Sequence, residues 1–123
     1  LGHLLTRADS QFFLKRLLVD LQTKYPQERR EFLFGFTGQS LTQERTYEIF
    51  GMADIGSNHV ICKIPPINVN QRIVLVHEFG HALGGEHIQD ANSFMNPNLR
   101  TTTQHPTFDS ENMKTITDRI SSL

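Results

Sequence analysis

The sequence predicts a single α+β domain, in which helices flank a group of short strands and one segment stays irregular. Apolar residues recur at helical spacing near both ends of the chain, in residues 9–25 and 110–122. Between these segments, aromatic and β-branched residues gather in short runs that Gly, Asn and Pro interrupt. The length of 123 residues suits one domain, which we expect to span residues 1–123. The expected order is helix, strands, helix, irregular segment and helix, which is typical of an α+β sandwich with a small C-terminal lobe.

The first expected element is a helix over residues 9–25. Apolar side chains recur along it at steps of three and four, and charged residues occupy the opposite face. These apolar residues are Phe13, Leu14, Leu17, Leu18 and Leu21. Asp9 or Ser10 can cap the start of this helix, and Pro26 lies just beyond its end.

Three strands are expected next, at residues 31–37, 46–53 and 59–64. The first, EFLFGFT, is rich in aromatic residues, and the third, HVICKI, ends before Pro65 and Pro66. The stretch DIGSN between the last two strands reads as a turn, so these strands are expected to form a hairpin.

A second helix is expected to begin after Asn68 or Asn70 and to run to Leu83, where Gly84 and Gly85 end it. The chain should then be irregular to about residue 108. A last helix is expected over residues 110–122, with Asp109 as its cap. One apolar stripe of that helix consists of Met113, Ile116, Ile120 and Leu123.

The overall charge and the length of the apolar runs argue against some kinds of partner. Twelve basic residues nearly balance thirteen acidic ones, so there is no electrostatic reason to expect a nucleic acid or a membrane surface as partner. No apolar run approaches the roughly 18 residues that a membrane span needs. The single cysteine, Cys62, is expected to be a small buried residue.

The stretch HEFGHALGGEH, residues 77–87, holds three of the six histidines of the chain. On a helix, His77 and His81 project from one face about one turn apart, so both can reach one metal ion. The glycine pair lets the chain turn back, so that His87 can supply a third nitrogen ligand. Three neutral nitrogens leave the fourth position of a zinc ion for water, which is typical of catalytic zinc. Glu78 can face that water and accept its proton as the water attacks a carbonyl carbon.

The same stretch matches HExxHxxGxxH, the long zinc signature of the metzincin metallopeptidases. Residues 93–97, SFMNP, resemble the Met-turn of that clan, and Met95 follows the third histidine at a spacing similar to that in matrixins. FDSENMKTI and GMADIGSNHVICK resemble segments of small bacterial metzincin-like domains. The resemblance implies a twisted mixed sheet with two helices, one of them the active-site helix, in an N-terminal lobe of about 1–84. It also implies a C-terminal lobe of about 85–123 that contains the Met-turn and ends in a helix.

By this resemblance, the protein is a zinc-dependent endopeptidase with one zinc ion, and most of its site residues can be named. The zinc ligands would be His77, His81 and His87, with Glu78 as general base, Gly84 at the turn and Met95 beneath the ligands. A protein or peptide substrate would bind extended along the edge strand 46–53, and the segment 96–108 would form the wall of a pocket. The candidate substrate contacts are Gly51, Ala53, Leu99 and Arg100. The protein is expected to be a monomer, and a zinc-binding interaction domain with little or no peptidase activity is the alternative.

Overall fold

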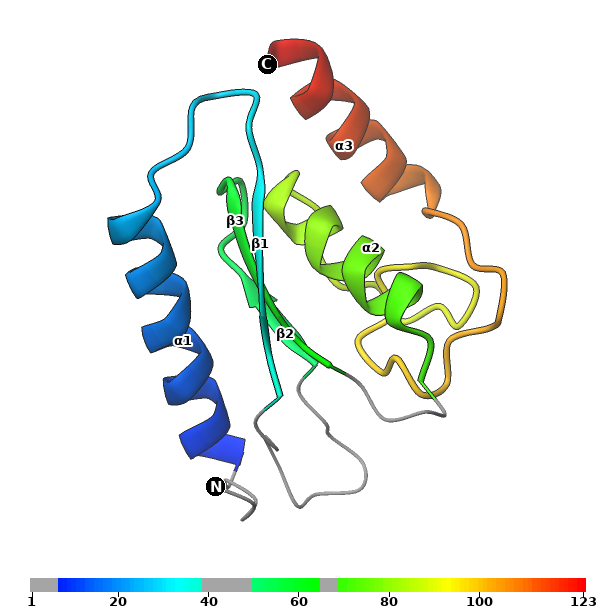
Figure 1. Cartoon of the computed structure of the whole chain (residues 1–123). Helices are drawn as coiled ribbons and strands as arrows, with labels where there is room; N and C mark the ends of the chain where they lie inside the picture. Colours follow the sequence, from blue (N-terminus) through cyan, green and yellow to red (C-terminus); the bar gives the residue numbers. More distant parts are fainter. Residues whose placement is uncertain (1–6, 39–49, 65–68) are drawn as a thin grey trace.

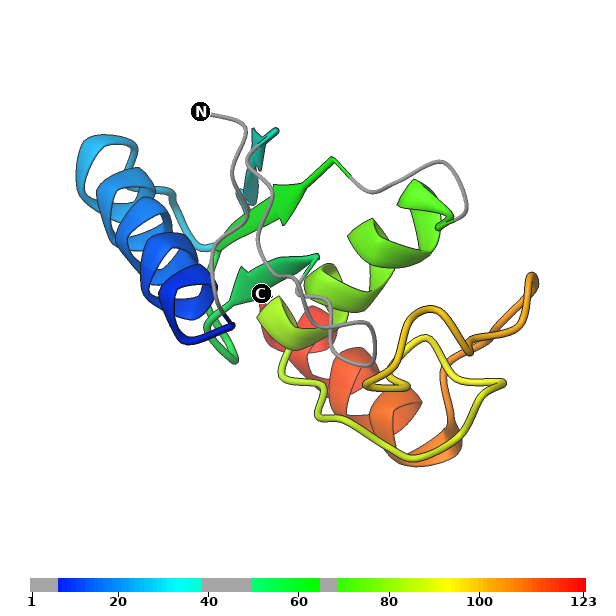
Figure 2. The same ribbon diagram turned by 90° about the horizontal axis from the view of Figure 1, so that it is seen from below.

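The computed structural model describes residues 7–38, 50–64 and 69–123. Its elements, in chain order, are α1 (Arg7–Lys24), β1 (Leu33–Thr37), β2 (Gly51–Ala53), β3 (His59–Lys63), α2 (Gln71–Ala82) and α3 (Ser110–Ser122). Figure 1 shows α1 on one face of the sheet and α2 on the other. Seen from below, α3 lies beyond α2 on the side away from the sheet (Figure 2). This arrangement confirms the predicted α+β class, with α1 and α2 beside the sheet and α3 at the end of the chain.

The sheet is mixed, and its strand order is β1-β3-β2. β1 runs parallel to β3, whereas β2 runs antiparallel to it and places Met52 opposite Ile61. The predicted hairpin of the last two strands is therefore confirmed. β2 lies at an edge of the described sheet, and residues 46–49 of the predicted strand lie outside the described residues.

Two apolar clusters lie on opposite faces of β3, because alternate side chains of a strand point to opposite sides. Val60 and Cys62 pack in the cluster that contains Val74 of α2, and Ile61 packs in the cluster that contains Leu14 of α1. Cys62 is almost fully buried, as predicted, and burial is the main cause that raises the pKa of its thiol to about 12. The two clusters fix α2 against the sheet and so fix the helix that carries the first two predicted ligands.

The helix ends agree with the sequence except at the start of α1. That helix begins at Arg7, so the prediction that Asp9 or Ser10 caps it is wrong. Both residues lie in the first turn of the helix. Small polar and acidic residues are tolerated there too, because the first backbone N–H groups of a helix have no partner within it. The predicted caps Asn70 and Asp109 do precede α2 and α3, and Asn68 lies outside the described residues.

The apolar stripe predicted for α3 is only partly buried. Ile116 is 6% exposed, whereas Met113 and Ile120 are 47% and 54% exposed. The remaining buried side chain of this helix is a polar one, Asn112. No helix in the described ranges has both the length and the apolar character that crossing a membrane requires.

Candidate metal centre

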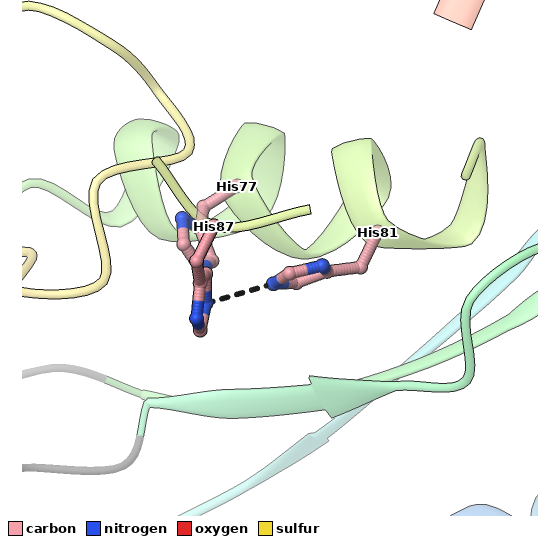
Figure 3. A group of neighbouring side chains, drawn as sticks. All are labelled: His77, His81 and His87. Carbon is pink, nitrogen blue, oxygen red and sulfur yellow. Dashed lines mark hydrogen bonds between the residues drawn. The ribbon is translucent and has the colours of Figure 1, made fainter. Parts of the chain in front are cut away.

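Two of the clustered histidines lie on α2, and the third lies on the segment that follows it (Figure 3). Gly84 makes this return possible, because its φ of +97° lies in the left-handed region that side chains disfavour. Its N–H donates to the carbonyl oxygen of His81 at 2.9 Å, which ends the helix. The chain then turns back and places His87 beside His77 and His81.

The three Nε2 atoms converge on one point. The Nε2 atom of His87 lies 3.0 Å from that of His81 and 3.3 Å from that of His77. A tetrahedral zinc ion with nitrogen ligands at 2.0–2.1 Å holds those nitrogens about 3.3–3.4 Å apart. The three predicted ligands thus lie at separations that fit one ion. Within the described ranges, they are the only group of three or more His, Cys, Asp or Glu side chains that could hold a metal ion.

The outer nitrogens of two of these rings are held by backbone carbonyls. His77 Nδ1 lies 2.6 Å from the oxygen of Phe94, and His81 Nδ1 lies 2.8 Å from the oxygen of Gly85. Because a carbonyl only accepts, each Nδ1 carries the hydrogen and each Nε2 presents a lone pair. His87 Nε2 can donate to only one of these lone pairs. One lone pair would then face the other nitrogens with no hydrogen between them. A cation at the centre would accept all the lone pairs, which supports a metal site.

The buried setting also keeps these rings in the form that binds metal. Burial lowers the pKa of His77 to about 3, and it is the main cause that lowers the pKa values of His81 and His87. The imidazoles are therefore neutral at pH 7 and can bind a cation without first losing a proton.

We expect His77 to make the metal-free protein less stable as the pH falls below about 6.5. In the unfolded chain its imidazole binds a proton near that pH, whereas in the folded chain it stays neutral until about pH 3. The unfolded state then binds more protons, which costs up to about 1.4 kcal/mol per pH unit. Urea unfolding of the metal-free wild type and of His77→Gln, at pH 7 and pH 5, measures this slope. An identical slope in both proteins would contradict the assignment.

Glu78 is buried beside the first ligand. Its Oε1 atom lies 3.9 Å from His77 Nε2, close to the convergence point of the imidazoles. Burial raises the pKa of this carboxyl to about 8 in the metal-free protein, and a nearby cation acts in the opposite direction. Gly51 of β2 packs against it, since a Cβ atom there would lie 2.8 Å from Glu78 Cγ. The absence of a side chain at residue 51 thus makes room for the carboxylate.

A cavity of about 400 Å³ opens in front of the histidines. Its lining residues are Gly51, Met52, Ala53, Ile55, Glu78, His81, Glu86 and His87. The predicted substrate contacts Gly51 and Ala53 therefore lie at this cavity.

Leu99 and Arg100 do not line this cavity, and their predicted contact with a substrate stays a prediction. They line a second cavity, of about 500 Å³, together with residues at the start of α2 such as Asn70. Leu99 packs against the core cluster, and the guanidinium of Arg100 lies 5.9 Å from the ring centre of Phe50. These contacts hold this part of the segment against the core.

Met95 is fully buried beneath the histidines and packs against α2. A Cβ atom at Gly80 would lie 2.6 Å from its sulfur, so only glycine allows this close approach. The Met95 carbonyl accepts from the N–H of Ile88 at 3.1 Å, and the preceding carbonyl, of Phe94, holds His77. The turn around Met95 thus supports two of the three ligands through its backbone.

Sequence reasoning missed a polar network that joins this turn to α3. The N–H of Met95 donates to Ser93 Oγ at 3.0 Å, and Ser93 Oγ donates to Asp109 Oδ1 at 2.7 Å. Asn112 Nδ2 donates to the same carboxylate at 2.8 Å. The Asn112 side chain also pairs with both backbone groups of Glu86, at 2.9 Å each. The residue before the third ligand is therefore held from α3.

We expect Asn112→Ala to weaken zinc binding by about ten-fold, because residues that orient ligands from behind often contribute ten- to hundred-fold. The substitution removes both contacts with the Glu86 backbone and leaves His87 less fixed. Competition with a chelator measures the affinity, and the exposed Lys114→Ala on the same helix is the control. Equal zinc affinity in Asn112→Ala and wild type would show that the third ligand does not need this clamp.

Comparisons with known proteins agree with this geometry. The matrixin model of peptidase family M10 matches residues 16–119, which is most of the chain. A search of curated proteins found no match. Among solved structures, archaemetzincin from Methanopyrus kandleri is similar, with a TM-score of 0.64 and 19% sequence identity. The similarity covers 88% of this chain and 65% of that one, so this chain spans about two thirds of its length.

These findings confirm the predicted metzincin-like fold and the predicted use of one zinc ion, since metzincins depend on zinc and the chain carries the three-histidine cluster. The structural likeness supports the fold, and the family match extends to the zinc signature itself. The chain therefore belongs to the matrixin family of zinc metallopeptidases.

Proposed function

We propose that this chain is a zinc-dependent endopeptidase in which Glu78 is the general base. The observation that carries this proposal is the convergence of three Nε2 atoms, with the Glu78 carboxylate 3.9 Å from one of them. Zinc, when bound, supplies a Lewis acid that polarises a peptide carbonyl and lowers the pKa of water. Glu78 would accept a proton from the attacking water and pass it to the leaving amine. His77, His81 and His87 would hold the ion, with the outer nitrogens of His77 and His81 fixed by backbone carbonyls.

The substrate would be a protein segment that binds in an extended form along β2. This strand pairs with β3 and with no other described strand, and two of its residues line the histidine cavity. An added strand would place its backbone opposite Gly51 and Ala53 and bring a carbonyl towards the convergence point. We also propose that the protein is a monomer. Its division into lobes of about 1–84 and 85–123 stays a prediction.

A complex peptide mixture tests this function. Zinc-loaded protein should cleave peptides at internal bonds, and a chelator should stop the cleavage. If the protein binds one zinc ion per chain and cleaves no peptide and no denatured protein, the alternative of a zinc-binding interaction domain is supported instead.

A further inference from the structure

We infer that Glu86 makes the cavity selective for substrates with a lysine or arginine close to the bond that is cut. This inference rests on the proposed function, because it concerns the occupant of the same cavity. Glu86 directly precedes the third predicted ligand and is exposed at the cavity wall. Neither the fold nor the predicted reaction needs a carboxylate there.

The charges around the cavity point to this selectivity. Among the residues that the structure describes, those that line the cavity include two carboxylates and neither lysine nor arginine. Glu78 is buried, so Glu86 presents the exposed negative charge to an incoming substrate. Within the described part of the chain, the Glu86 carboxylate has no ion pair or hydrogen bond, since its contacts with Asn112 use only its backbone. A basic side chain of the substrate would supply the missing partner.

The backbone that carries this carboxylate is held in a defined place. Asn112 fixes both the N–H and the C=O of Glu86, so the direction in which its side chain leaves the backbone is set. The preceding residue, Gly85, packs so closely that a Cβ atom there would lie 2.8 Å from the Gly80 oxygen. The fixed backbone therefore keeps residue 86 at the wall of the cavity.

The Glu86 charge reaches the zinc ligands. Glu86 lines the same cavity as His81 and His87 and directly precedes His87 in the chain. A substrate residue bound near His81 would therefore lie in the electric field of the Glu86 carboxylate. Ion pairs exposed to solvent have modest strength, so we expect a preference of about two- to five-fold for a basic over a neutral residue.

Peptides that differ at one position test the inference. Starting from a sequence that zinc-loaded protein cleaves, each residue within three positions of the cut is replaced in turn by Lys, Gln or Glu. At one position at least, kcat/KM should fall from Lys to Gln to Glu, by about two- to five-fold per step. Glu86→Gln should remove this order and Glu86→Lys should reverse it, whereas Glu111→Gln, which changes an exposed carboxylate of α3, should keep it. High salt should weaken the preference for Lys over Gln and Glu.

Binding separates this inference from the proposed function, measured with Lys, Gln and Glu variants of a peptide that binds the zinc-loaded protein, whether or not it is cleaved. Fluorescence anisotropy with zinc-loaded Glu78→Gln reports affinity without cleavage. If no peptide is cleaved but affinity follows the order Lys, Gln, Glu and depends on Glu86, the charge selectivity stands and the peptidase proposal fails. If peptides are cleaved and the order is the same in wild type and Glu86→Gln, the selectivity is wrong and the peptidase proposal stands. The absence of both cleavage and binding overturns both.

Discussion

Replacing Glu78 by Gln is expected to lower kcat by at least about a hundred-fold while one zinc ion per chain stays bound. Glutamine keeps the size and shape of glutamate but cannot accept a proton from the attacking water. General acid–base catalysis of this kind contributes about 10²- to 10⁴-fold. The fold should tolerate the change, because Glu78 is buried and an amide costs less to bury than a carboxylate. Peptide cleavage and zinc content are measured on the same sample.

The matched control for this substitution is Glu111→Gln, which removes an exposed carboxylate from α3. This variant should cleave at the rate of the wild type. A Glu78→Gln protein that retains zinc and more than about a tenth of the wild-type activity would contradict the role of Glu78 as base.

Removing zinc is expected to abolish cleavage and to lower the free energy of unfolding. The three imidazole nitrogens converge only in the folded chain, so zinc binds the folded state in preference to the unfolded one. At free zinc concentrations of 100 to 1,000 times Kd, this preference stabilises the fold by about 2.7–4.1 kcal/mol. Urea unfolding with and without added zinc measures the difference.

His81→Ala should lose this response, because it removes one of the three ligands, whereas the exposed His105→Ala should keep it. If added zinc leaves the unfolding midpoint of the wild type unchanged, the cluster is not a zinc site.

The sequence predicted the helices and the hairpin well, because these elements leave periodic patterns of apolar residues. The buried position of Leu14 and Leu18 on α1 follows directly from such a pattern. The start of α1 could not be predicted, since Asp9 and Ser10 suit a cap and a first turn equally well. The segment 96–108 has no periodicity, so the sequence could not predict that Leu99 and Arg100 line a second cavity.

The three histidines could be predicted because their spacing reflects helix geometry over a few residues. The network through Ser93, Asp109 and Asn112 could not, because Asn112 meets Glu86 across 26 positions of the chain. One signal was available: Asn112 lies four residues before Ile116, so it is a polar residue on the buried face of α3. A buried amide needs partners, and such a position marks a long-range contact even when the partner is unknown.

Zinc titration against a competing chelator shows whether three imidazoles of this chain hold one ion. We predict one equivalent of tightly bound zinc in the wild type and in Glu78→Gln, and loss of tight binding when His77, His81 or His87 is replaced by Ala. The three histidines are not zinc ligands if the wild-type protein takes up no zinc. The same conclusion follows if the single-histidine variants bind zinc as tightly as the wild type.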